Sequence, residues 1–152
     1  MEIRIATPED SDQIAEMAIA FRNHLERDMP TDDQFKSGIS RLLSSDDAKF
    51  YIAIEDEQPI GYVLQRSRFS MWASGIDSTI EDLFVFPIAR KRGVGKKLIQ
   101  FALQKIKESN CKSVCLDTNE NNVASTKIYE QLGFNSVSKR WKGRQRFYRL
   151  NF

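Results

Sequence analysis

The sequence predicts a mixed α/β (α+β) fold, in which a mostly antiparallel central sheet of about seven strands is flanked by four helices. Across 152 residues the segments read as strand, two helices, three strands, helix, strand, helix and two strands. The three middle strands follow one another through short connections, which favours an antiparallel meander. A helix over residues 93–108 favours a crossover between parallel strands. No repeat or long linker divides the chain, so we expect a single domain over residues 1–152.

The first elements carry clear boundary signals. Residues 3–5 alternate apolar and charged side chains and predict a short strand. Thr7 and Pro8 are typical of a helix start, as N-cap and first helical residue. The helix that follows carries an apolar stripe, and Thr31 caps a second helix with its own apolar face. The two stripes are Ile14, Met17, Ala18, Phe21 and Leu25, then Phe35, Ile39, Leu42 and Leu43.

The middle of the chain predicts strands joined by a turn. Residues 50–54 form an apolar run, 55–59 form a polar turn, and 60–64 begin the returning strand. Residues 67–77 are mixed in character, and we expect loops there. Residues 79–86 predict the next strand, which leads into the crossover helix.

The last third predicts a strand, a helix and a hairpin. Residues 113–117 form the strand, and a short helix follows over residues 122–132. Gly133 is expected to stop that helix in the left-handed conformation. A final hairpin completes the fold. Its strands and turn are residues 134–141, 146–150 and 142–144.

Composition excludes several classes of protein. The 23 basic and 21 acidic residues leave a net charge of 23 − 21 = +2, which is small for a general nucleic-acid binder. No apolar run approaches the roughly 20 residues that span a bilayer, and the N-terminus lacks a signal-peptide pattern. We therefore expect a cytoplasmic protein with no membrane or nucleic-acid partner. Cys111 and Cys115, with a single histidine, favour buried reduced thiols and no metal site.

The most informative segment is a cationic turn, residues 90–97, between an apolar strand and a helix. Five basic residues there surround Gly93 and Gly95. First helical turns normally favour acids, because the helix dipole is positive at that end. The simplest reason for cations is an anionic ligand bound by backbone N–H groups and neutralised by Lys and Arg. A plain helix start with an exposed basic turn also fits. The spacing is neither a Walker A loop nor a Rossmann fingerprint, since Leu98 replaces the third glycine.

Two motifs together carry a family resemblance. Arg-x-x-Gly-x-Gly at residues 90–95 follows a Val-x-Pro strand end, and Asn-x-x-small-x-x-Ile-Tyr-x-x-x-Gly-Phe spans residues 122–134. This combination resembles the GCN5-related N-acetyltransferase (GNAT) superfamily, closely over residues 80–134 and by element order over the whole chain. Members bind acetyl-CoA and transfer its acetyl group to a primary amine.

The resemblance implies a role for particular residues toward acetyl-CoA, as a co-substrate and without a metal. Main-chain groups near the strand end would pair with the pantetheine arm, and the cationic turn would hold the diphosphate. Asn122 matches an asparagine that contacts the cofactor, and Tyr129 matches a residue near the thioester sulfur. The strand-end residues are Phe84, Val85 and Phe86, and the diphosphate residues are Arg90, Lys91, Arg92, Gly93, Val94, Gly95 and Lys96.

Acetyl transfer to an amine requires removal of an ammonium proton, donors for the oxyanion and a proton source for the thiolate. Glu81 is the leading candidate for the base, directly or through water, and Asp82 and water remain alternatives. Regular alternation would place Glu81 on the face of Leu83, and Asp82 on the face of Ile80 and Phe84, where burial raises a carboxyl pKa. Tyr129 is the candidate acid, although a packed core tyrosine also fits. The only histidine, His24, is expected to be exposed on a helix.

The acceptor is expected to be a cationic primary amine of a small molecule or peptide. Candidate contacts are Glu26, Asp28, Trp72 and Asp82, because acids and aromatic rings favour cations. Acids near the second helix, Asp32 and Asp33, equally serve as first-turn residues. Alternatives are a non-catalytic acyl-CoA-binding module, acetylation of a protein amine, and a nucleic-acid module over residues 139–146. The resemblance also implies that a homodimer is possible.

Overall fold

The computed structural model describes residues 1–138 and 141–152, and the chain divides into two compact units, residues 1–114 and 115–152. The first unit is built on a five-stranded sheet with the strand order β1-β2-β3-β4-β5. Its strands are β1 (Glu2–Ile5), β2 (Ala48–Glu55), β3 (Gln58–Ser70), β4 (Gly75–Val85) and β5 (Ser113–Cys115), whose last residue opens the second unit. The predicted fold class and element order are confirmed, with the seven strands divided into a sheet of five and a small sheet of two.

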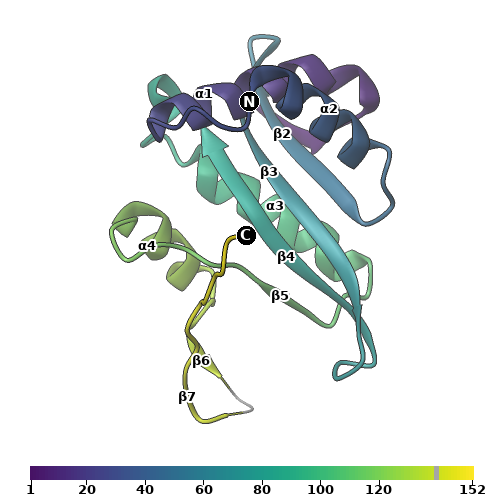
Figure 1. Cartoon of the computed structure of the whole chain (residues 1–152), viewed down its shortest axis with the longest axis vertical. Helices are drawn as coiled ribbons and strands as arrows, with labels where there is room; N and C mark the ends of the chain where they lie inside the picture. The colour runs from purple at the N-terminus through teal and green to yellow at the C-terminus, as the bar shows by residue number, and fades with distance from the viewer. Residues whose placement is uncertain (139–140) are drawn as a thin grey trace. The chain divides into compact units, whose positions relative to one another are not determined.

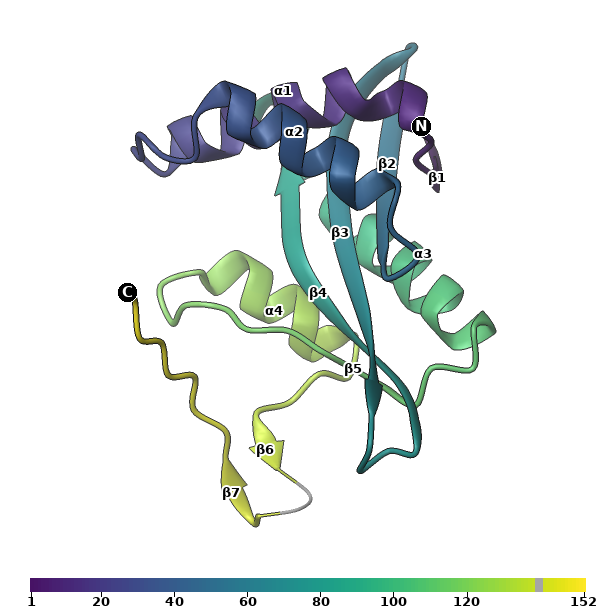
Figure 2. The same cartoon turned by 45° about the vertical axis from the view of Figure 1, so that its right-hand side comes forward.

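Helices cover both faces of the five-stranded sheet. The helices α1 (Ser11–His24) and α2 (Asp32–Leu43) lie on one face, and α3 (Val94–Glu108) lies on the other (Figure 1, Figure 2). Short 3-10 turns, η1 (Pro8–Asp10) and η2 (Pro87–Ala89), precede α1 and α3. The core between the sheet and the first two helices consists of Ile14, Ala15, Met17, Ala18, Ile39, Ala48, Phe50, Ile52, Tyr62, Leu64 and Phe84. The opposite face buries Val94, Leu98, Ile99, Ala102 and Ile106 of α3.

The meander is antiparallel, as predicted, and local sequence explains its boundaries. Strands β1, β2, β3 and β4 pair antiparallel in that order. Asp56 and Glu57 form the tight turn between β2 and β3, with φ of 50° and 61°. Lys112 N donates to Ile76 O at 2.8 Å and Ser113 Oγ donates to Asp77 Oδ1 at 2.9 Å. The start of β5 thus lies beside the start of β4, as a parallel crossover requires.

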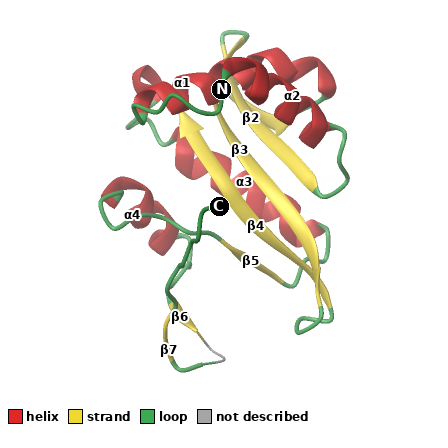
Figure 3. Cartoon of the chain, in the orientation of Figure 1, coloured by secondary structure: helices red, strands yellow, loops and turns green. Residues whose placement is uncertain are grey.

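The prediction of loops over residues 67–77 is wrong. Pairing of β3 with β4 continues out to Ser70 and Gly75, so only residues 71–74 form the turn (Figure 3). Phe69 at 70% and Ile76 at 41% relative exposure show why the pattern misled. Phe69 is paired with Ile76, so the apolar side chains of this hairpin end lie on an exposed face, and the pattern of apolar inside and polar outside does not mark the strands.

The prediction for the cysteines is half right. Both thiols are free, but Cys115 is exposed and Cys111 is only partly buried. Cys111 Sγ donates to Ile76 O and to Ser113 O, each at 3.1 Å, next to the start of β5. Its position at a polar strand start, rather than in the core, accounts for the difference.

The second unit contains α4 (Val123–Gln131) and a two-stranded sheet of β6 (Val137–Ser138) and β7 (Gly143–Arg144). Gly133, with φ of 93°, ends α4 as predicted. Phe134 N donates to Tyr129 O at 3.0 Å and Gly133 N donates to Glu130 O at 3.1 Å, which is a Schellman motif.

The expected strand over residues 146–150 does not form, and the expected strand over 134–141 shrinks to β6. Phe147, Tyr148 and Leu150 are all exposed, so neither face of this segment collects the apolar side chains that would hold a strand. Lys139 and Arg140, part of the hairpin and of the alternative nucleic-acid segment, lie outside the described residues.

Two features are absent from the described residues, 1–138 and 141–152. No helix there is both long enough and apolar enough to cross a bilayer. No group of three or more His, Cys, Asp or Glu side chains within residues 1–138 and 141–152 could hold a metal ion.

Candidate active site

A β-bulge in β4 places the two candidate base residues. Leu64 of β3 is aligned with Asp82, whereas the next residue, Gln65, is aligned with Ile80. Glu81 is therefore an extra residue in β4, and the side-chain alternation reverses across it. The expectation that Asp82 shares a face with Ile80 is wrong for this reason. Asp82 shares the face of Leu64, which packs against α1 and α2.

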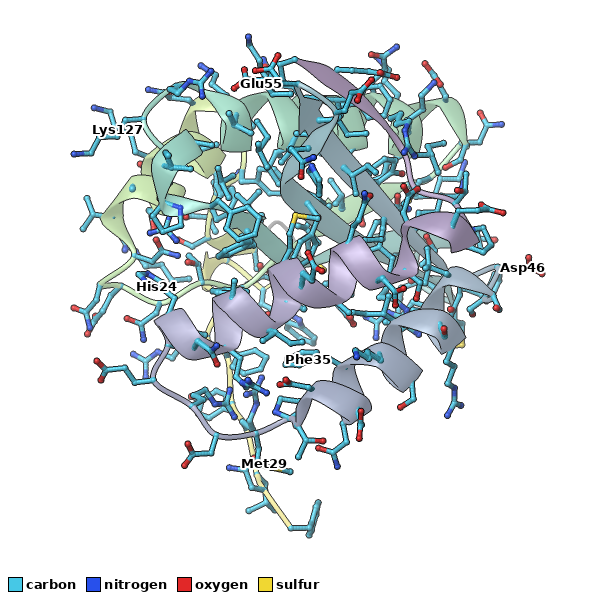
Figure 4. The ribbon with its side chains drawn as sticks, turned by 90° about the horizontal axis from the view of Figure 1, so that it is seen from above. His24, Met29, Phe35, Asp46, Glu55 and Lys127 are labelled. Carbon is cyan, nitrogen blue, oxygen red and sulfur yellow. The ribbon has the colours of Figure 1, made fainter. Side chains whose placement is uncertain are left out.

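Asp82 lies in a hollow of about 210 Å³ in the first unit, which we call the Asp82 pocket. Its apolar walls come from α1, α2 and the connection between them: Ala18, Phe21, Leu25, Met29, Pro30 and Phe35. Its polar lining consists of Arg22, Arg27, Tyr62 and Asp82. Figure 4 shows Met29 in the connection between α1 and α2, and Phe35 on the side of α2 that faces α1. Most of the wall is apolar, as is usual for a small-molecule site.

The environment of Asp82 disfavours its charge. Burial raises the pKa of the Asp82 carboxyl, and a hydrogen bond from Tyr62 opposes this shift. The Tyr62 hydroxyl lies 3.4 Å from Asp82 Oδ2, and burial also raises the pKa of Tyr62, so the phenol keeps its proton and donates it. A raised pKa moves a carboxyl group in a pocket toward the range in which it can act as a general base.

Glu81 has different surroundings. Its side chain is 44% exposed, and Oε2 lies 3.9 Å from Nη1 of Arg66. Arg66 also pairs with Asp47 at 3.0 Å, so Glu81 belongs to a charged cluster at the surface of the sheet. Of the two carboxyl groups, Asp82 is the one that lines the pocket.

The strand-end residues continue from this pocket toward the cationic turn. Phe84 is buried and stacks on Phe21 with ring centroids 5.3 Å apart. Phe86 N donates to Ile60 O at 3.0 Å, which extends the pairing of β4 with β3 by one residue. Val85 O accepts a hydrogen bond from Arg90 Nε at 2.9 Å. The end of β4 is thus tied directly to the first arginine of the turn.

The cationic turn leads into α3 through two left-handed residues. Lys91 and Gly93 have positive φ, 60° and 80°, and Gly93 is the N-cap of α3. Lys97 N donates to Gly93 O at 3.0 Å, which is the first helical bond of α3. The N–H groups of residues 94–96 precede that bond and have no carbonyl four residues back within the helix. With no acid in the first turn, this end can hold an anion.

Two arginines of the turn have protein partners. Arg92 Nη2 lies 2.7 and 2.8 Å from the two carboxylate oxygens of Glu55 at the end of β2. Arg90 lies over the Phe84 ring at 6.0 Å, and its Nη1 is 3.4 Å from Nε2 of His24. His24 is exposed at the end of α1, as expected. These contacts fasten the turn to β2, β4 and α1.

Asn122 and Tyr129 belong to the second unit. Asn122 is the N-cap of α4, where its carbonyl accepts from Thr126 N at 3.0 Å and its side chain makes no capping bond. Tyr129 is 9% exposed, and its ring meets Phe134 edge-on at 6.0 Å. The Gly-Phe pair of the second motif therefore both ends α4 and packs against Tyr129.

The other candidate acceptor contacts do not line the Asp82 pocket. Glu26 and Asp28 are exposed in the connection after α1, on either side of Arg27, which does line it. Trp72 lies in the turn at the end of the β3–β4 hairpin and is 74% exposed. Leu64 to the end of β3 is six residues, roughly 20 Å of strand, so Trp72 is remote from the pocket.

Sequence reasoning missed several pocket residues. Phe21 and Phe35 belong to the predicted stripes and read as ordinary core positions. Tyr62 carries a general signal, since a buried tyrosine requires a partner for its hydroxyl. Arg27 gave none, because an arginine between two acids is typical of an exposed helix end.

Comparison with known proteins identifies the family. The model of the acetyltransferase (GNAT) family matches residues 12–134. The chain belongs to this family, which confirms the resemblance found in the sequence.

Named relatives give the family some functional detail. Aminoglycoside N(6')-acetyltransferase type 1 of Salmonella typhimurium is 30% identical over 112 residues, which cover 71% of this chain and 77% of the relative. The structure of aminoglycoside N-acetyltransferase AAC(6')-Iy in complex with CoA superposes with a TM-score of 0.79 at 24% identity, covering 99% of this chain and 95% of that one. Ribosomal-protein-alanine N-acetyltransferase from Brucella melitensis biovar Abortus 2308 gives 0.77 at 18% identity, covering 100% of both chains. The two structures support the fold.

Proposed function

We propose that this chain is an acetyl-CoA-dependent N-acetyltransferase, which acetylates a primary amine of a small molecule or peptide held in the Asp82 pocket. The observation that carries the proposal is the continuity of β4. Asp82 of this strand lines the apolar pocket. Val85, the last residue of the same strand, accepts a hydrogen bond from Arg90, the first arginine of the cationic turn. The relative named aminoglycoside N(6')-acetyltransferase type 1 supports a small-molecule acceptor.

The cationic turn fits acetyl-CoA, which supplies an activated acetyl thioester. The N–H groups of residues 94–96, with Arg90, Lys91 and Arg92, would hold the diphosphate. The main chain of Phe84, Val85 and Phe86 would bind the pantetheine arm as a further strand does. The second motif supports Asn122 as a further cofactor contact, and we propose a single N-acetyltransferase domain over residues 1–152.

Asp82 is the base that the surroundings favour, with Glu81 or a water molecule as the alternative. An amine of lysine type has an unperturbed pKa of about 10.4, so it arrives charged and must lose a proton before it attacks. The raised pKa of Asp82 and its place in the pocket support it as the acceptor of that proton. Glu81, exposed and beside Arg66, would act through water.

Tyr129 is the proposed acid. Its phenol would donate a proton to the departing thiolate, which stabilises the leaving group. No enzyme nucleophile is required, because two substrates held in attacking orientation supply much of the rate increase. The chain's own task is therefore to bind, orient and exchange protons.

The experiment is a set of primary amines incubated with acetyl-CoA while free thiol is measured. We expect amine-dependent release of CoA and a mass increase of the amine by one acetyl group. The variant Gly95→Asp, which places an anion in the turn, should weaken acetyl-CoA binding. Gly38→Asp adds the same charge to α2, where the structure shows open space, and should leave binding unchanged.

The outcomes separate the proposal from its alternatives. Binding of acetyl-CoA with no thiol release for any amine would overturn the proposal in favour of a non-catalytic acyl-CoA-binding module. Acetylation of a protein amine, and of no small amine or peptide, would move the acceptor to the protein class.

A further inference from the structure

We infer that the acceptor is amphoteric: a small apolar molecule that carries a carboxylate as well as the primary amine, with Asp82 facing the amine and Arg27 facing the carboxylate. This inference rests on the proposed function and names its substrate class. It follows from the charges that line the Asp82 pocket, from their partners and from the volume of the pocket.

The pocket lining contains one carboxyl group and two guanidinium groups, and only one of these guanidinium groups is engaged. Arg22 Nη1 donates to Pro30 O at 2.7 Å and to Asp32 Oδ1 at 2.8 Å. Its Nε and Nη2 donate to Asn23 Oδ1 at 3.1 and 2.9 Å. Arg22 is therefore a structural link between α1 and α2, and its charge is matched by Asp32.

Arg27 has no such match. Within residues 1–138 and 141–152, no acidic side chain lies within ion-pair distance of its guanidinium, although Glu26 and Asp28 adjoin it in sequence. It lines both the Asp82 pocket and a second, more open hollow of about 430 Å³, and Met29 and Pro30 line both of them as well. A cation in the lining of an apolar pocket attracts an anion and repels a second cation.

The backbone fixes Arg27 in this position. Arg27 N donates to Arg22 O at 3.2 Å and Glu26 N donates to Asn23 O at 3.0 Å, which ends α1 in a Schellman motif. Glu26 occupies the left-handed position with φ of 53°, where glycine is usual. This sharp turn directs the chain so that Arg27, rather than the acid on either side, lines the pocket.

The remaining lining of the pocket suits a small apolar side chain. Phe21, Phe35 and Met29 line the pocket, and its volume of about 210 Å³ lies below the roughly 300–1,000 Å³ of sites for drug-sized ligands. It equals roughly seven water volumes, which is the scale of one amino-acid side chain with its backbone. An apolar α-amino acid, with its amine and carboxylate on one end of the molecule, meets these requirements.

The test compares acceptors that differ only in the carboxylate. Phenylalanine is paired with phenethylamine, leucine with isopentylamine, and spermidine and kanamycin serve as polycations. In wild type we expect kcat/KM to be about tenfold higher for each amino acid than for its amine, mainly through KM, since one charge-assisted hydrogen bond is worth about that factor. Arg27→Ala should bring this ratio close to one, and Arg27→Lys should restore part of it. Arg41→Ala, an exposed arginine of α2 outside the pocket, should leave the ratio unchanged.

The possible failures are distinguishable. If amines are acetylated but the carboxylate brings no advantage, or if the polycations are preferred, the inference is overturned and the acetyltransferase proposal stands. A carboxylate preference that survives Arg27→Ala would also overturn it. If no acceptor releases thiol from acetyl-CoA, the proposed function fails, and the inference fails with it.

Discussion

Gly61 in β3 faces the end of β4 at a distance that leaves no room for a methyl group. A Cβ added there would lie 2.7 Å from Phe84 O, 3.1 Å from Val85 Cγ2 and 3.2 Å from Leu98 Cδ1. The first contact is with backbone, so one of the two strands must move. Overpacking of this kind lowers the free energy of unfolding by about 1–3 kcal/mol. Replacing glycine with alanine raises it by roughly 0.5–1 kcal/mol, because alanine loses less conformational entropy on folding. We expect Gly61→Ala to lose roughly 1–2 kcal/mol, which lowers Tm by about 2–8 °C in a chain of this size.

The measurement is thermal unfolding by circular dichroism, together with the Kd for acetyl-CoA. Because the affected backbone belongs to residues 84–85, proposed to hold the pantetheine arm, affinity should fall as well. Gly38→Ala is the matched control, since its new Cβ meets nothing within 4 Å and α2 gains about 0.5–1 kcal/mol of helix propensity. A Gly61→Ala protein that melts at or above the wild-type temperature would refute the close approach between β3 and β4.

Three further predictions concern the site. In a calorimetric titration, Arg92→Ala should weaken acetyl-CoA binding about 2–5-fold. Glu55→Gln frees the same guanidinium from its ion pair and should tighten binding. Equal weakening by both variants would make the ion pair purely structural. Because the pKa of Asp82 is raised in the folded state, wild type loses stability as pH rises above the unfolded value of about 3.9. Asp82→Asn should therefore melt higher than wild type at pH 7 and equally at about pH 3, while transfer is slowed; a lower Tm at pH 7 would contradict the burial argument. Tyr129→Phe should reduce kcat about tenfold or more and leave the Kd for acetyl-CoA unchanged, and an equal loss in both would make Tyr129 a binding residue.

Local signals predicted much of the fold. Thr31 caps α2 because its hydroxyl accepts from Gln34 N at 3.2 Å, while Gln34 Oε1 accepts from Thr31 N at 2.9 Å. Gly133 ends α4 because the Schellman motif requires a left-handed backbone at this position, which glycine adopts without strain. These features depend on neighbours three or four residues away, so the sequence contains them directly.

The features that sequence reasoning missed depend on distant neighbours. The bulge at Glu81 is defined by the register of β4 against β3, and no residue type within β4 predicts it. Arg27 lines the Asp82 pocket because Glu26 adopts a left-handed conformation, in which glycine is the usual residue. The partnership of Tyr62 with Asp82 crosses two strands. The sequence thus identifies the candidate acids, but it does not show which of them lines the pocket.

The bulge also changes how this strand can be compared with others. Glu81 divides β4 into two halves. Odd-numbered residues face one side of the sheet before Glu81 and the other side after it, so Ile80 and Asp82 face opposite sides although they are two residues apart. A relative whose strand lacks the extra residue would show the same faces with one position fewer. An alignment of this segment therefore needs a single gap at Glu81, and without it the carboxyl group of the pocket would be matched to a residue of the opposite face.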